Sequence, residues 1–374
     1  MPLSLRLSAF YFAHFVHGGG LLAYFPLYLA WRGLGAVEIA WVLALPQIAR
    51  TFAPAAWGAL ADRTGARRGI VAFSCLASAV AYAALPFVES FHGIVAVIGV
   101  ASVLSAAGLP LVEAITLGAL AGQPGRYGPI RLWGSVGFVL AVLGLGAWLD
   151  LQPVRALPWP LFAFALAALA IALSLPPSHS SVHAARVRLE LTPPVRALLG
   201  GGFFMAAAHG TLYAFLTLLL QRAGYSGIVI GVLWTLGVLA EIAVFLWLPQ
   251  IFRRFALAHI LVFSFACAVV RFLMLGWLAE ILWIIVLAQL LHAASFGAFH
   301  AASVAAMHRV VPEAAQARGQ TLFSSLSYGA GGAAGALIAG WAWEAGGPAL
   351  AFSLSALAGL CGLLLAHGLK RAGL

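Results

Sequence analysis

Long apolar segments alternate with short polar breaks along almost the whole chain. A helix that crosses the hydrocarbon core of a bilayer needs roughly 20 apolar residues, and the sequence offers twelve segments of this kind. The pattern therefore predicts an all-α membrane protein with twelve transmembrane helices. The predicted helices cover residues 7–31, 37–61, 69–88, 92–120, 129–149, 158–176, 196–221, 227–250, 256–276, 281–308, 318–342 and 348–369.

The breaks between these segments carry residues that end helices. "AGQPGRYG" and "EAGGP", for example, combine Gly with Pro, and both residues interrupt regular helices. The longest break is "PPSHSSVHAARVRLELTPP". We expect it to divide the chain into an N-terminal six-helix bundle at 1–177, a cytoplasmic linker at 178–195 and a C-terminal six-helix bundle at 196–374.

Composition supports a lipid environment. The chain is 63% hydrophobic and only 8% charged, whereas soluble domains carry about a quarter charged residues. The net charge of +10 could suggest nucleic acid as a partner. Its basic residues, however, fall mostly in short loops between apolar segments, which is a membrane-topology signal. We therefore expect no nucleic-acid partner.

The loop arginines and lysines predict the orientation. If both termini are cytoplasmic, fourteen Lys and Arg residues lie inside, three lie outside (Arg32, Arg155 and Arg222), and three lie within spans. This distribution satisfies the positive-inside rule. The inside set is Arg6, Arg63, Arg67, Arg68, Arg126, Arg186, Arg188, Arg196, Arg253, Arg254, Arg309, Arg318, Lys370 and Arg371.

The two halves resemble each other in sequence. Residues 23–43 align with residues 213–233 at a shift of 190, so that Arg32 falls on Arg222. Each half thus begins with a helix, an Arg-Gly turn and a second helix. Because each half has an even number of helices, the repeats are parallel, as in transporters that rock one bundle against the other around a central site.

The segment between the second and third predicted helices is "GALADRTGARRG", residues 58–69. It resembles the signature loop of the major facilitator superfamily, in which charged residues of this loop lock the outward-facing state. The second half keeps only a degenerate copy, "PQIFRRFAL". With twelve helices and a two-fold repeat, the resemblance covers the whole chain. It implies gating roles for Gly58, Asp62, Arg63, Gly65, Arg67 and Arg68.

A closer resemblance lies in "VEA" at 112–114 and "YGPIRLWGSVGF" at 127–138. These motifs are similar to a helix hairpin of the superfamily branch that contains the lactose and phenylpropionate permeases. There a glutamate and an arginine at this spacing hold the sugar, which implies substrate-binding roles for Glu113 and Arg131. Phe138 stands where a tryptophan stacks on the sugar. His292 matches a histidine of the proton path, but Ser295 replaces the acidic residue that follows it.

The positions of Glu113 and Arg131 also indicate an interaction between them, independently of the resemblance. Each lies nine residues from Gly122, so at a rise of about 1.5 Å per residue both lie roughly 13 Å from the turn. Ionised groups inside a membrane are costly and usually paired. Two interpretations stay open: a salt bridge that only joins two helices, or a pair that binds a polar substrate through hydrogen bonds.

Three further charges lie within predicted spans. Glu241 is surrounded by Leu, Ile and Phe, and desolvation disfavours its charged form, which suits a proton carrier. The alternative is a fixed partner of Arg50 or Arg271. Arg50 lies deep enough to contact the substrate or Glu241. Arg271 is either a substrate-site residue or an interfacial anchor whose head reaches the membrane edge.

Histidines are concentrated in the predicted helices that line the cavity in the resembled superfamily. His14 and His17 are substrate-site candidates, and His292 is a candidate for both substrate and proton binding, because imidazole titrates near neutral pH. Packing is the alternative for at least two of the five intramembrane histidines, and for Phe138. The spacings do not favour zinc, so no metal or cofactor is expected. The five are His14, His17, His209, His292 and His300.

Together these features predict a proton-coupled symporter that imports a small organic solute by alternating access. Arg50, Arg131 and Arg271 outnumber Glu113 and Glu241, which favours an anion such as an aromatic carboxylate. If the Glu113–Arg131 pair dominates, a sugar or nucleoside is equally natural. Glu241, Glu113 and His292 are the predicted proton-coupling residues.

The sequence fits other function classes less well. A proton-coupled drug exporter usually places acids against an apolar pocket with few arginines, and this charge pattern weighs against it. A non-transporting membrane solute sensor or an intramembrane enzyme would have to work without a large soluble domain, a metal cluster or a phosphate-binding motif. We therefore expect no enzyme activity. The expected partners are the solute, protons and lipid, with the protein a monomer in the inner (plasma) membrane.

Overall fold

The computed structural model describes residues 2–120, 123–176 and 189–371. Several sequence-based predictions lie outside these residues. They concern the turn at Gly122, the topology residues Arg186 and Arg188, and residues 178–188 of the predicted linker.

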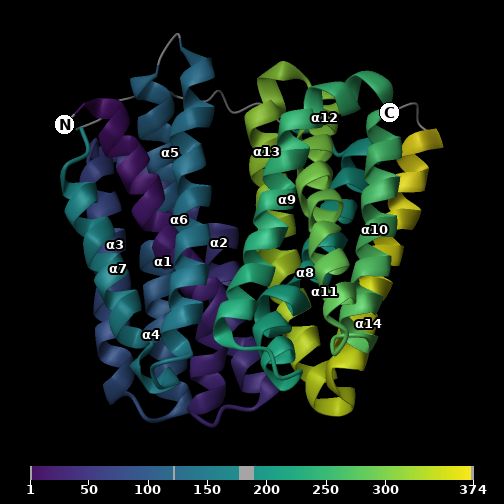
Figure 1. The fold of residues 1–374 in the computed structure, drawn as a ribbon. Coiled ribbons are helices and arrows are strands. Elements are labelled where there is room, and N and C mark those ends of the chain that lie inside the picture. The colour runs from purple at the N-terminus through teal and green to yellow at the C-terminus, as the bar shows by residue number, and fades with distance from the viewer. Residues whose placement is uncertain (1, 121–122, 177–188, 372–374) are drawn as a thin grey trace. The chain divides into compact units, whose positions relative to one another are not determined.

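All regular secondary structure in these described ranges is helical (Figure 1), so the predicted all-α class is confirmed. Short 3-10 segments (η1–η3 and η5) and two π-helical segments (η4 and η6) connect or extend the α-helices. The elements are α1 (Leu3–Trp31), α2 (Ala36–Thr64), α3 (Arg67–Ala84), η1 (Leu85–Phe87), α4 (Phe91–Ser105), α5 (Gly108–Ala119), η2 (Pro124–Arg126), α6 (Tyr127–Leu149), η3 (Val154–Ala156), α7 (Pro158–Leu173), α8 (Pro193–Arg222), α9 (Gly227–Arg254), α10 (Leu257–Trp277), α11 (Leu282–Leu290), η4 (Ala293–Ala298), α12 (Phe299–Val310), η5 (Glu313–Ala315), α13 (Gln316–Ser324), η6 (Ser325–Gly331) and α14 (Gly332–Arg371).

Ten helical stretches of the described chain are long and apolar enough to cross a membrane. Large apolar side chains on these stretches stay exposed, for example Leu246 at 73% and Trp247 at 62%. Exposed apolar surface on this scale is typical of helices that face lipid. The chain is therefore a multi-pass membrane protein.

The last of the ten stretches is much longer than the others. It covers Glu313–Leu369, and its helix is broken at Gly346 and Gly347. Gly347 has a φ of 68°, a left-handed conformation that glycine adopts at no steric cost. Pro348 follows and removes a backbone donor. The predicted break at "EAGGP" is therefore present.

The sequence repeat has a structural counterpart. Helices α1 and α2 begin the first half as predicted, and α8 and α9 begin the second half at nearly the predicted shift of residue number. Each pair is joined by a glycine with positive φ, Gly33 at 84° and Gly224 at 86°. The Arg-Gly turns are thus built in the same way, because each needs a residue that tolerates the left-handed region.

The described chain forms two compact units. Two helices are divided between the units. Residues 35–47 of the α2 region belong to unit 2, and residues 226–232 of the α9 region belong to unit 1. The predicted bundle boundaries remain a prediction. Unit 1 is Met1–Leu34, Ile48–His183 and Ser226–Val232, and unit 2 is Gly35–Gln47, Ala184–Tyr225 and Leu233–Leu374.

Glycines allow the central helices of each unit to approach closely. In unit 1, a Cβ at Gly137 of α6 would overlap the carbonyl of Phe12 on α1. In unit 2, a Cβ at Gly335 of α14 would overlap the carbonyl of Ala207 on α8. Small residues favour this packing in membranes, where the hydrophobic effect does not drive helices together. They hold α1 and α8 in the interior of their units.

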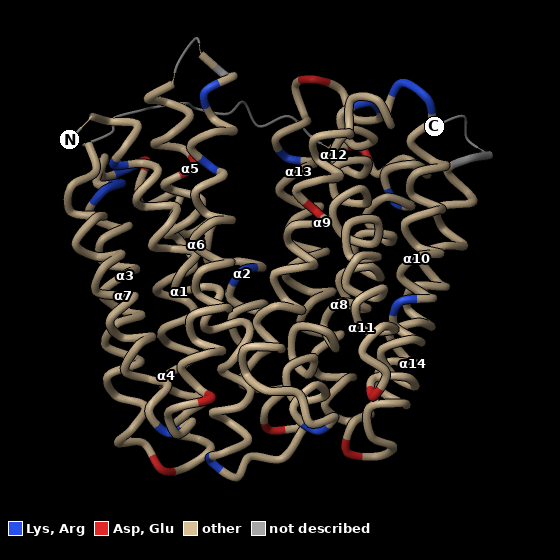
Figure 2. The backbone as a smooth tube through the Cα atoms, viewed as in Figure 1, with Lys and Arg blue, Asp and Glu red and all other residues tan. Residues whose placement is uncertain are grey.

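Most charged residues lie near the ends of the helices, and few lie along their middle (Figure 2). This distribution is what the cost of placing a charge in hydrocarbon demands. The few interior charges are therefore the residues whose surroundings need explanation.

The packing at Gly137 generates a testable expectation. Gly137→Leu should lower the free energy of unfolding in detergent by about 1–3 kcal/mol or more, because the added side chain must push α1 away. The matched control is Gly144→Leu on the same helix, since Gly144 is exposed and has no atom near its Cβ position. Equal thermal stability of the two variants would contradict the close approach of α1 and α6.

Candidate functional site

Unit 1 gathers polar side chains from α1, α5 and α6. Glu113 lies on α5, and Tyr127 and Arg131 lie on α6 one turn apart, so they share a face of that helix. Tyr127 is a polar neighbour of both Glu113 and Arg131, and also of Tyr11 on α1. Glu113 and Arg131 interact electrostatically, but no direct ion pair joins these two described side chains. The hydroxyl of Tyr127 is thus a third polar group beside Glu113 and Arg131, the pair that the sequence predicts.

Arg131 is held against aromatic rings. Its guanidinium carbon lies 4.2 Å from the ring centre of Phe15 and 5.5 Å from that of Tyr11. Gly134 makes this possible, because a Cβ there would come within 2.8 Å of both Arg131 and Phe15. A cation over a ring face is stabilised by the ring quadrupole. Arg131 therefore has a fixed orientation without being neutralised by direct contact with Glu113.

The predicted histidines of α1 belong to the same cluster. His14 interacts electrostatically with His17, Arg131 and Arg50, so the structure brings these four predicted site residues together with Glu113. The ring of His17 lies 5.2 Å from that of Tyr82. Its Nε2 atom is buried and makes no hydrogen bond within the described part of the chain.

Phe138 takes a packing position in this unit. Its ring approaches Gly19 of α1, where a Cβ would lie 3.1 Å from the ring. The side chain is only half-buried. Phe138 therefore supports the contact between α1 and α6, and its predicted role in substrate binding stays a prediction.

Unit 2 contains a second polar cluster, centred on Glu241 and His292. The Nε2 atom of His292 lies 3.7 Å from a carboxylate oxygen of Glu241. Two glycines make room for them: Gly297 lies against the Glu241 side chain, and Gly237 lies against the His292 ring. Among the described residues, Glu241 and Arg271 do not form the direct ion pair that was one of the sequence-based alternatives.

Arg271 is fully buried, with 1% of its surface exposed. Its Nε donates to the Ala288 carbonyl at 2.8 Å, and its terminal nitrogens donate to Gln289 at 3.0 Å and Ser295 at 3.3 Å. Gln289 is fixed in turn by a hydrogen bond to the Leu233 carbonyl. The interpretation of Arg271 as a snorkelling interfacial anchor is therefore wrong. Hydropathy along one helix could not reveal the neighbours that bury it.

His209 joins this network and was not assigned a role from the sequence. Its Nδ1 lies 2.9 Å from the Met205 carbonyl, and its Nε2 lies 3.3 Å from a terminal nitrogen of Arg271. Its ring packs 5.8 Å from His292. The only signal in the sequence was a histidine inside an apolar helix.

An aromatic ladder continues from His292. Phe296 stacks on His292 at 5.2 Å and on His300 at 6.4 Å, both with an interplanar angle of 11°. His300 Nδ1 lies 2.6 Å from the hydroxyl of Tyr328. Both Phe296 and Tyr328 lie in π-helical segments, η4 and η6. Such segments shift the register of a helix and are frequent at functional sites.

The predicted gating loop has the expected local chemistry. Arg67 donates to Asp62 at 2.8 Å, joining the end of α2 to the start of α3. Gly65 has a φ of 67°, which explains why glycine stands at the turn. Arg68 donates to the Leu175 carbonyl at 3.4 Å. Within the part of the chain that the structure describes, no contact of Gly58 or Arg63 bears on their predicted roles, and gating remains a prediction.

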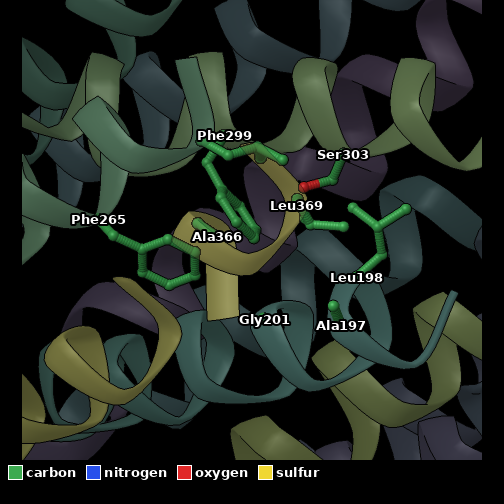
Figure 3. Close-up of a pocket in the computed structure, with 9 residues that line it drawn as sticks. Ala197, Leu198, Gly201, Phe265, Phe299, Ser303, Ala366 and Leu369 are labelled. Atoms are coloured by element: carbon green, nitrogen blue, oxygen red, sulfur yellow. The ribbon is translucent and has the colours of Figure 1, made fainter. Parts of the chain in front are cut away.

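A small pocket in unit 2 is lined by none of the residues of these clusters. Figure 3 shows it between α8, α10, α12 and α14, lined mostly by apolar side chains such as Leu198 and Phe265. Ser303 contributes the one polar side chain among the nine lining residues. Such a lining offers little to orient a polar solute, so we do not regard it as the substrate site. Within the described residues, no group of three His, Cys, Asp or Glu side chains is placed to hold a metal ion.

Apolar helices of membrane-spanning length, packed into units that each bury a polar cluster, are the architecture of a membrane transporter of the major facilitator type. The comparison with protein families agrees. The chain belongs to the MFS_1 like family, whose model matches residues 4–354.

Individual relatives are similar to the chain over different lengths. The "Maltose permease" of Geobacillus stearothermophilus is 27% identical over 370 residues, covering 95% of this chain and 92% of that protein. The "Probable 3-phenylpropionic acid transporter" of Escherichia coli (strain K12) is 31% identical over 186 residues, covering 48% of each. The solved structure of the nucleoside transporter NupG is 19% identical, covers 99% of both chains and superposes with a TM-score of 0.83, which shows a shared fold.

The His300–Tyr328 contact can be tested by mutation. Tyr328→Phe removes the hydroxyl, and we expect the free energy of unfolding in detergent to fall by about 1 kcal/mol, the usual net value of a hydrogen bond. The control is Tyr225→Phe, whose hydroxyl donates to the Glu280 carbonyl at an exposed turn and should contribute less. If both variants lose the same stability, the interior hydrogen bond has no special role.

Proposed function

We propose that this transporter is a proton-coupled symporter that imports an aromatic carboxylate by alternating access. The observation that carries the proposal is the state of Arg131. Its guanidinium lies over the rings of Phe15 and Tyr11 and makes no direct ion pair with Glu113. A cation beside aromatic rings offers both parts that an aromatic carboxylate requires: charge for the carboxylate and apolar surface for the ring.

The proposal assigns a role to each cluster. In unit 1, Arg131 and Arg50 attract the carboxylate, while Glu113, Tyr127 and the α1 histidines orient it. In unit 2, Glu241 carries the proton and His292 passes it on, because the two lie 3.7 Å apart and imidazole exchanges protons near neutral pH. The loop at residues 58–69 gates the transition. Arg271 contributes its positive charge from a buried position.

A sugar is the second candidate substrate. The similarity to the Geobacillus stearothermophilus maltose permease extends over 95% of this chain, whereas the similarity to the E. coli phenylpropionic acid transporter covers about half. In the sugar alternative, Glu113 and Arg131 would hold hydroxyl groups from two sides. The interior excess of arginine over glutamate favours the acid. Export and non-transporting solute sensing remain the competing modes.

We further propose twelve spans with both termini in the cytoplasm of the inner (plasma) membrane. The segment Glu313–Leu369 has 57 residues, about 85 Å at a rise of about 1.5 Å per residue, and a bilayer core is only about 30 Å thick. Its break at Gly347 supports two spans there. With the nine other candidate spans and α1, the total is twelve. A monomer and the two six-helix bundles complete the proposal.

Uptake into proteoliposomes tests the substrate and the role of Arg131. Labelled 3-phenylpropionate should accumulate when the outside is made acidic, and Arg131→Lys should reduce its uptake at least about tenfold, because lysine lacks the planar, two-point donor geometry of arginine. The control, Arg222→Lys, changes an arginine that lies over Trp343 at the end of α8 and should transport normally. Uptake of maltose in place of the acid would select the sugar alternative, and normal uptake by Arg131→Lys would leave Arg131 a structural role.

Proton coupling through Glu241 has its own test. Glu241→Gln should abolish accumulation driven by a pH gradient but preserve exchange of labelled for unlabelled solute, since exchange needs no net proton movement. Glu280→Gln, an exposed carboxylate in a turn, serves as the control and should retain both activities. Full pH-driven accumulation by Glu241→Gln would remove Glu241 as the proton carrier.

A further inference from the structure

His17 on α1 carries a buried polar atom that the fold does not pair. Its Nε2 atom is shielded from solvent and has no hydrogen-bond partner among the described residues. The ring of Tyr82 packs against the imidazole at 5.2 Å with an interplanar angle of 61°, so an aromatic ring lies beside it. An unpaired buried polar atom is costly and rare in folded proteins. A ligand group that forms a hydrogen bond with Nε2 would recover that cost.

Open space lies next to His17 on the same helix. A Cβ built at Gly18 would meet no atom within 4 Å outside its own stretch of α1, although Gly18 is half-buried. The next two residues, Gly19 and Gly20, by contrast pack tightly against α6. Close helix packing therefore explains Gly19 and Gly20 but not Gly18, where the missing side chain leaves space unfilled.

This open space adjoins the cation of unit 1. Gly18 lies three residues after Phe15 and four after His14, a spacing that places all three on one face of α1. The ring of Phe15 supports the guanidinium of Arg131, and His14 interacts with that guanidinium electrostatically. His17 follows His14 by three residues, about 4.5 Å further along the helix. A positive charge, an open space and an unpaired polar atom therefore follow one another along α1.

The chemistry around His17 favours a neutral hydroxyl as its partner. The Nε2 atom of a neutral imidazole donates in one tautomer and accepts in the other, and a hydroxyl group can do either. A cationic group is disfavoured, because His14, one turn away, already lies in the field of Arg131 and Arg50. A second carboxylate would lose far more hydration free energy on burial than a hydroxyl does.

We propose that the site in unit 1 selects aromatic carboxylates that bear a hydroxyl group on the ring. This inference rests on the proposed carboxylate transport and defines its substrate more closely. The carboxylate lies at Arg131, the aromatic ring fills the space beside Gly18, and the hydroxyl pairs with Nε2 of His17. Because Nε2 is shielded from solvent, the imidazole turns toward the ligand about its outer side-chain torsion, which is soft. His17 is thus a specificity-determining residue.

Equilibrium binding to the purified protein tests the inference. The probes are 3-phenylpropionate, 3-(3-hydroxyphenyl)propionate, 3-(4-hydroxyphenyl)propionate and the two matching methylphenyl compounds, measured by calorimetry at a single pH. A methyl group is similar in size to a hydroxyl but forms no hydrogen bond. At least one hydroxyl compound should bind at least about fivefold more tightly than its methyl counterpart, because a buried unpaired atom gains a partner.

Variants of His17 assign this preference to the imidazole. His17→Leu removes both ring nitrogens, so the preference for the hydroxyl over the methyl compound should disappear. His17→Gln supplies a side chain that can both donate and accept, and it should keep a preference for the hydroxyl compound. An undiminished preference in His17→Leu would overturn the role of His17.

Gly18→Leu tests the position of the aromatic ring. The new side chain enters open space, so thermal stability in detergent should be retained. Affinity for every aromatic acid should fall at least about tenfold, because the leucine occupies the space that the ring requires. Gly144→Leu, at an exposed glycine of α6 with no atom near its Cβ position, is the matched control and should bind as the wild type does. Wild-type affinity in Gly18→Leu would contradict the proposed ring position.

The outcomes separate the inference from the function that it rests on. If 3-phenylpropionate binds but neither hydroxyl compound binds more tightly than its methyl counterpart, the hydroxyl subsite is overturned and carboxylate transport stands. Binding of maltose alone, with none of the aromatic acids bound, would overturn the proposed substrate class and the inference with it.

Discussion

One constraint governs the interior of this protein: a charge placed among apolar helices must be held by other groups, because no bulk water solvates it. Arg271 meets the constraint with four hydrogen bonds to neutral acceptors. Arg131 meets it by lying over the rings of Phe15 and Tyr11. In both units the cation is fixed in place without direct contact with a carboxylate. Interior positive charge that is positioned but not neutralised is the property that favours an anionic solute.

Backbone features provide the space for these arrangements. Gly134 admits the stack of Arg131 on Phe15, and Gly297 admits the side chain of Glu241. The π-helical segments η4 and η6 carry Phe296 and Tyr328, so that a continuous set of rings runs from His292 to the His300–Tyr328 contact. Packing in one unit therefore determines which polar atoms meet in its interior, and through them the chemistry that the site can perform.

The sequence predicts the helical architecture well, because the length of an apolar run and the Gly and Pro residues that end it are local properties. The turns at Gly33 and Gly224 and the break at Gly347 occur where expected. Contacts between helices were harder to predict from the sequence. Burial of Arg271 depends on α8 and α11, the place of Tyr127 beside Glu113 depends on side-chain orientation, and a π-helical register leaves no periodic signal. The sequence could thus nominate interior charges but could not identify their partners.

The central claim is that one proton and one carboxylate cross together, and their combined charge tests it most directly. Initial uptake of 3-phenylpropionate should be measured in proteoliposomes under an inward proton gradient and, separately, under an imposed membrane potential at equal pH. The account predicts uptake driven by the proton gradient and none driven by the potential alone. Uptake driven by the potential at equal pH would show that net charge moves with the solute, and would contradict the joint movement of one proton with one carboxylate.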